Sequence, residues 1–128
     1  MRRVAPQGTT RIALRGCYLA PGFIDLHVWG EPETISRDAA RGGATAFLTT
    51  LGPDAPQTLL RRLSALHVER VTLHGAECLG VHLEGPFLNP VRGGVLRKSA
   101  MRRASVRELA RLARAARGRL RLMTLAPE

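Results

Sequence analysis

Residues 80–90 read GVHLEGPFLNP, an apolar run that ends in one acidic residue and a Gly-Pro pair. A short apolar run bounded by turn residues is typical of a strand that is buried on both faces. The run therefore predicts a buried strand with Glu84 at its carboxyl end. A buried carboxylate without a partner is energetically costly, so a cation or a network of hydrogen bonds should face Glu84.

Similar apolar runs lie on both sides of this stretch, and each reads as another strand buried on both faces. The four expected strands cover residues 22–28, 45–51, 79–84 and 120–125. Helical patterns separate them. This alternation favours a parallel sheet, because parallel neighbours need crossover connections, so we expect an α/β fold. An open doubly wound sheet and part of a (β/α)₈ barrel both fit, although no glycine-rich nucleotide-binding motif follows the first strand.

The helical patterns have recognisable ends. Pro32 suits the first turn of a helix that runs to about residue 41 and stops at a Gly-Gly pair. Asp54 is expected to cap a second helix, which carries leucines along one face. Ser105 and Glu108 have the spacing of a capping box at the start of a third helix.

The amino-acid composition limits the kinds of binding partner that we expect for this chain. The chain has 128 residues, a formal net charge of +10 and Lys98 as its only lysine. Such a charge favours phosphorylated ligands, but aromatic residues make up only 4% and no readout motif occurs, so we expect no nucleic-acid partner. No apolar run suits a signal peptide or a membrane span, which predicts no membrane partner and a cytoplasmic location. Cys17 and Cys78 are expected to be reduced core residues.

Candidate chemical groups follow the expected strands. The carboxyl ends of parallel strands meet at one edge of a sheet, and His27, Glu84 and Glu128 fall at such ends. An imidazole and a carboxylate that converge there suit a divalent metal that polarises a carbonyl group and acidifies a water molecule. The residues alone leave a structural role open, with His27 hydrogen-bonded and Glu84 capping the next turn. His82 lies inside its strand and is expected to be structural.

Two further histidines are weaker candidates for metal ligands. His67 and His74 fall in the end of the second helix and the loop after it, where solvated side chains are expected.

Four segments together carry a resemblance to a known family: LAPGFIDLHVWG (19–30), GATAFLTTL (43–51), GVHLEGPFLNP (80–90) and LMTLAPE (122–128). They resemble the N-acetylglucosamine-6-phosphate deacetylases of the amidohydrolase superfamily. The HLEGPF element with a downstream TLAPE is specific to that family, whereas PGFID-x-H marks only the superfamily. The resemblance implies a metal-dependent (β/α)₈ barrel that converts N-acetylglucosamine 6-phosphate to glucosamine 6-phosphate and acetate.

The resemblance also implies roles for single residues. Glu84 matches the family's metal-ligating glutamate, and His27 matches the first histidine of the superfamily's His-x-His pair. Trp29 stands where many relatives have the second histidine, so one divalent ion, zinc by donor type, is expected rather than two. Val95 lies in a segment that contacts the sugar phosphate in relatives, where Leu96 replaces an imidazole donor. An amino-sugar phosphate is therefore the expected small-molecule partner.

The resemblance covers only part of the family's length. Residues 1–19, with weak strand signals at 11–14 and 17–19, resemble the start of a small β domain, and residues 20–128 resemble about the first four β/α units of the barrel. Family members are much longer, and their general acid/base lies on later strands. Half a barrel would expose apolar side chains and strand edges. We therefore expect a catalytically inactive isolated chain that forms a homo-oligomer or depends on the missing half.

Two functions from different classes follow. One is an amide hydrolase represented by its N-terminal portion. The alternative is a non-catalytic half-barrel module that pairs with another chain.

Overall fold

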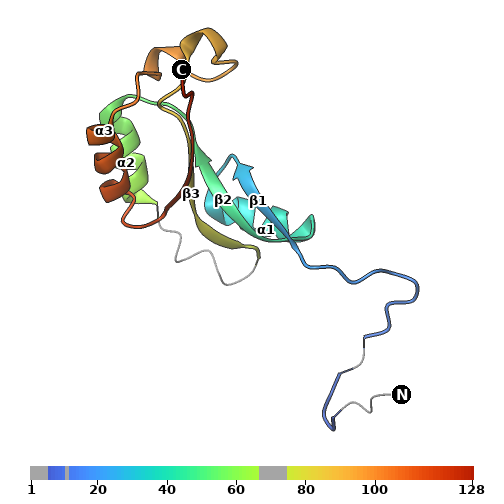
Figure 1. Ribbon diagram of the computed structural model, residues 1–128. Coiled ribbons are helices and arrows are strands. Elements are labelled where there is room, and N and C mark those ends of the chain that lie inside the picture. The colour runs from blue at the N-terminus through green and yellow to red at the C-terminus, as the bar shows by residue number, and fades with distance from the viewer. Residues whose placement is uncertain (1–5, 11, 67–74) are drawn as a thin grey trace.

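The computed structural model describes residues 6–10, 12–66 and 75–128. They form four strands and three α-helices in strict alternation, with two short 3₁₀ turns before the last helix (Figure 1). The elements are β1 (Phe23–Val28), α1 (Pro32–Arg41), β2 (Ala44–Leu51), α2 (Pro56–Ala65), β3 (Glu77–Glu84), η2 (Pro90–Arg92), η3 (Lys98–Ala100), α3 (Val106–Ala115) and β4 (Leu120–Thr124). His67 and His74 lie outside the described residues.

All four strands are parallel, and each pairs with its neighbour in sequence, so the sheet order is β1-β2-β3-β4. A doubly wound sheet reverses its strand order at a switch point, whereas a barrel adds strands in sequence. The observed order is that of a partial (β/α)₈ barrel. This confirms the expected α/β fold and decides between the two architectures that the sequence left open.

The helices cover one face of the sheet. Ile35 of α1 packs with Phe47, while Leu59 of α2 packs with Leu51, and alternate residues of a strand share a face. Figure 1 shows α2 and α3 side by side. The opposite face of the sheet, which corresponds to the inner face of a barrel, carries other side chains, including His82 and Glu84 of β3.

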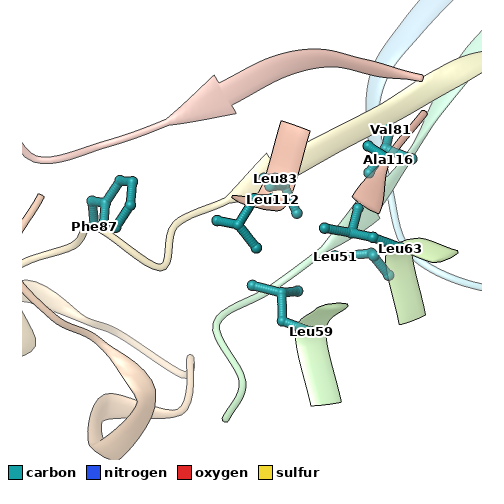
Figure 2. Close-up of a cluster of buried hydrophobic side chains, with 8 residues drawn as sticks. All are labelled: Leu51, Leu59, Leu63, Val81, Leu83, Phe87, Leu112 and Ala116. Carbon is teal, nitrogen blue, oxygen red and sulfur yellow. The ribbon is translucent and has the colours of Figure 1, made fainter. Parts of the chain in front are cut away.

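The main core lies between β2, β3, α2 and α3. Figure 2 shows its side chains converging from these four elements and from the turn after β3. Burial of each leucine stabilises the fold by roughly 1.5–3 kcal/mol. The cluster consists of Leu51, Leu59, Leu63, Val81, Leu83, Phe87, Leu112 and Ala116.

Two of the three expected helix starts are confirmed. Pro32 opens α1, and the Ser105 hydroxyl accepts a hydrogen bond from the Glu108 backbone N–H at 3.3 Å. The Glu108 carboxylate accepts from Arg102 Nε at 2.8 Å. The expected cap by Asp54 is wrong, because Ala55 is the N-cap of α2 and no side chain caps this helix.

Burial differs from the sequence prediction in the first strand. Phe23, Ile24 and Leu26 of β1 are exposed, whereas burial on both faces was expected. The cause is the position of β1, which forms one edge of the sheet and, among the described strands, pairs with β2 alone. Strand β4 forms the other edge and is also largely exposed.

The segment before β1 also differs. Weak strands were expected at residues 11–14 and 17–19. Residue 11 lies outside the described residues, and residues 12–14 and 17–19 have no strand pairing and lead away from the sheet (Figure 1). A strand needs a partner for its backbone groups, and none of the described residues supplies one here. The assignment of residues 1–19 to a small β domain therefore stays a proposal.

The cysteines fall in two environments. Cys78 is buried as expected, and burial raises the pKa of its thiol. Cys17 is exposed, so its expected place in the core is wrong. Over the described ranges, no helix is both long and apolar enough to cross a membrane.

Candidate metal centre at the carboxyl ends of the strands

Parallel pairing brings together the two residues expected to hold a metal. His27 stands near the carboxyl end of β1 and Glu84 is the last residue of β3. His27 Nε2 lies 3.5 Å from Glu84 Oε2, although β2 separates their strands. The side chain of Glu84 is 23% exposed and that of His27 is 45% exposed. Both donors can therefore be reached from solvent.

The distance fits two donors on one ion. Zinc binds imidazole nitrogen and carboxylate oxygen at about 2.1 Å, and two such donors at a tetrahedral angle lie about 3.4 Å apart. Within residues 6–10, 12–66 and 75–128, no group of three or more His, Cys, Asp or Glu side chains forms a complete metal cage. His27 and Glu84 thus suit part of a divalent-metal centre that leaves other coordination positions open.

His82 lies directly against this pair. Its side chain is buried, its Nε2 lies 2.8 Å from Thr124 Oγ1, and its ring meets His27 edge-on with 4.9 Å between ring centroids. Burial lowers the pKa of His82, and the neighbouring His27 lowers it further. A neutral, hydrogen-bonded ring fits the structural role expected for His82 and gives His27 a fixed surface to pack on.

Trp29 also contacts His27. Its indole Nε1–H donates a hydrogen bond to His27 Nε2 at 3.0 Å, with the two rings at 65°. The six-membered ring of Trp29 covers Gly52, where an added Cβ would lie 2.7 Å from Cη2. Gly52 therefore leaves the space that the indole fills. Trp29, which was expected to alter the metal site, thus touches the imidazole ring of His27 directly.

A cavity of about 560 Å³ opens onto His27 and Glu84. Val95, expected to contact substrate, lines it with an exposed side chain. Glu128 also lies at its wall, held by Asn89 Nδ2, which donates to Glu128 Oε1 at 3.0 Å. The remaining lining residues are Trp29, Leu88, Asn89, Arg92, Gly93, Gly94, Leu96, Leu125 and Ala126.

Sequence reasoning missed two of these residues. Arg92 adds a cation to the cavity wall, and Asn89 caps the turn η2, its Oδ1 accepting from Val91 N at 2.9 Å. The Asn-Pro pair before the turn was the available signal, because asparagine is a frequent cap.

Comparison with known proteins gives this geometry a context. No protein-family model matches the chain. The N-acetylglucosamine-6-phosphate deacetylase of Bacillus subtilis is 33% identical over 126 residues, which cover 86% of this chain and 32% of the relative. The bovine enzyme of the same name is 32% identical over 130 residues. The chain is homologous to the N-acetylglucosamine-6-phosphate deacetylases. This confirms the family resemblance found in the sequence.

Solved deacetylases share the fold. The Mycobacterium smegmatis deacetylase, solved as a mutant with N-acetyl-D-glucosamine-6-phosphate, has a TM-score of 0.67 and 31% identity, covering 84% of this chain and 31% of its own. The Pasteurella multocida deacetylase has a TM-score of 0.72 and 26% identity, covering 97% of this chain and 36% of its own. The chain thus spans about a third of the length of these deacetylases.

Proposed function

We propose that this chain forms part of a metal-dependent amide hydrolase that converts N-acetylglucosamine 6-phosphate to glucosamine 6-phosphate and acetate. The observation that carries the proposal is the 3.5 Å approach of His27 to Glu84 at the mouth of a cavity. The names of the homologues support the reaction. A metal-binding pair on the inner face of a partial barrel is where such a reaction would take place.

His27 and Glu84 would hold one divalent ion, with zinc suited to the donor pair. When bound, the ion would polarise the acetyl carbonyl group and acidify a water molecule. His82 would keep the His27 ring in place through its edge contact. The group that takes the water's proton is proposed to come from the rest of the deacetylase fold, so the 128-residue chain alone should be inactive.

The cavity wall supports an anionic amino-sugar substrate. Arg92 supplies a positive charge, Gly94 leaves the backbone open, and Val95 would line the sugar subsite. One homologue, at 30% identity over 130 residues, is an N-acetylgalactosamine-6-phosphate deacetylase of Escherichia coli O157:H7. We favour the glucosamine epimer because most of the named relatives act on it, and the galactosamine epimer should be tested beside it.

The wider assignments are also proposals. A phosphorylated sugar substrate favours a cytoplasmic location, without nucleic-acid or membrane partners. We place the start of a small β domain at residues 1–19 and the barrel portion at 20–128. The exposed apolar side chains of β1 favour a homo-oligomer, or dependence on a chain that completes the barrel.

That same exposure favours one alternative function. A non-catalytic half-barrel module would pair β1 with another chain, and Phe23 at 74% and Ile24 at 57% exposure offer the apolar surface for it. Such a module would need no metal at His27 and Glu84. Binding of a complementary chain without hydrolysis would be its signature.

Complementation separates the two functions. The chain would be co-expressed with the segment of the Bacillus subtilis deacetylase that it does not match, and acetate release from N-acetylglucosamine 6-phosphate would be measured. The hydrolase proposal predicts acetate release that is lost in Glu84→Gln and kept in Glu77→Gln, since Glu77 is exposed at the opposite end of β3. Stable pairing of the two parts without acetate release would support the module instead.

A further inference from the structure

Two groups approach the same nitrogen of His27. Trp29 Nε1 lies 3.0 Å from His27 Nε2, and Glu84 Oε2 lies 3.5 Å from it. An indole N–H can only donate, so Nε2 must accept with its lone pair. A neutral imidazole has one lone-pair nitrogen, and its hydrogen is then on Nδ1. While the bond to Trp29 holds, His27 has no lone pair left for a metal ion.

Trp29 is 48% exposed, but part of its indole packs against neighbouring residues. Gly52 follows β2 and supplies the space under the six-membered ring, where any Cβ would lie 2.7 Å from Cη2 and 3.3 Å from Cζ3. The ring also meets the edge of His27, with centroids 5.9 Å apart. Contacts on two sides hold the N–H toward Nε2, so the hydrogen bond is a feature of the packing.

We propose that Trp29 is a positioning residue that competes with the divalent metal for His27. With the indole in place, Glu84 is the donor open to the ion, and His27 joins only when the N–H leaves Nε2. This inference rests on the metal site proposed above. It adds a control element to that site, because the packing of one aromatic ring sets how strongly the pair binds metal.

The expected change in zinc affinity follows from the loss of one neutral hydrogen bond. Its net worth corresponds to a roughly two- to tenfold change in an equilibrium constant. Trp29→Phe keeps an aromatic ring but removes the N–H, and should tighten zinc binding by that factor. Gly52→Ala should act in the same direction by pushing the ring away, which covers the case in which Trp29→Phe fails to fold.

The hydrogen bond has a spectroscopic signature that needs no metal. Trp29 is the only tryptophan of the chain, so its indole N–H gives a single resonance in a ¹⁵N–¹H NMR spectrum. A proton donated to imidazole nitrogen resonates downfield, and His27→Ala should move the signal upfield. Zinc should move it in the same direction in the unmodified chain. An indole signal that His27→Ala leaves in place would overturn the inference.

Zinc titration by calorimetry on the full 128-residue chain completes the test. Tyr18→Phe is the control, because Tyr18 is exposed and removed from the site. Tighter binding in Trp29→Phe but not in Tyr18→Phe supports competition. Equal binding in all variants overturns the role of Trp29 and leaves the metal site standing. If neither the unmodified chain nor Trp29→Phe binds zinc, the metal site and this inference both fall.

Discussion

His82 Nε2 and Thr124 Oγ1 lie 2.8 Å apart and join β3 to β4 on the face of the sheet that carries the candidate metal centre. The bond fixes the ring of His82, and that ring packs edge-on against His27. A residue of the last strand thus helps to set the position of a candidate ligand on the first. The site is therefore sensitive to the packing of the whole sheet, which the following predictions test.

The core between β3 and α3 can be probed with two leucines of the same helix. Leu112 is 1% exposed and belongs to the main cluster, whereas Leu109 is 38% exposed. Leu112→Ala should lower the free energy of unfolding by about 2–5 kcal/mol, because it leaves a cavity. Leu109→Ala should cost clearly less. Urea denaturation followed by circular dichroism measures both, and equal losses would contradict the described core.

Strands β3 and β4 meet at a glycine that no other residue can replace without strain. Gly80 has φ +141°, and a Cβ there would lie 2.3 Å from the carbonyl oxygen of Arg119. Gly80→Ala should therefore destabilise the chain by roughly 2 kcal/mol or more. Gly42→Ala is the matched control, since its Cβ would meet only ordinary contacts of 3.5 Å or longer. A thermal melt in which both variants behave alike would refute this reading of the strand pair.

The exposed face of β1 should cause self-association. Ile24 is 57% exposed on the edge strand, and a lysine there would place a charge on an apolar face that is open to pairing. Ile24→Lys is expected to shift the chain toward monomer in sedimentation velocity experiments. Val106→Lys on α3, where Val106 is 86% exposed, should have no such effect. A native chain that is already a monodisperse monomer with a sharp melt would disprove the expectation.

Local signals predicted most of the secondary structure. The apolar run before Glu84 became β3, the Ser105 hydroxyl caps α3, and the alternation of strands and helices gave the parallel sheet. The exposure of β1 was not predictable from its own residues, because an apolar strand reads alike whether or not a second neighbour covers it. Asp54 failed as a cap because its carboxylate pairs with Arg97, 2.8 Å away and distant in sequence.

The part of the site that strand topology determines was predictable from the sequence. Strand ends of a parallel sheet must meet, so His27 and Glu84 could be placed together from the sequence. Arg92 was missed because a loop residue's direction depends on turns that composition does not fix. The hydrogen bond from Trp29 was missed for a different reason. It depends on the space left by Gly52, and nothing in the sequence joins these two residues.

Zinc binding by Glu84 is the most direct test of the account. Isothermal titration calorimetry on the full chain would compare the unmodified protein with Glu84→Gln, which keeps the side chain's shape but removes its charge. Glu77→Gln is the control, because Glu77 is exposed at the amino end of the same strand. The account predicts that Glu84→Gln weakens zinc binding roughly tenfold or more and that Glu77→Gln leaves it unchanged. Equal zinc affinity in all three proteins would contradict a metal centre at the ends of β1 and β3.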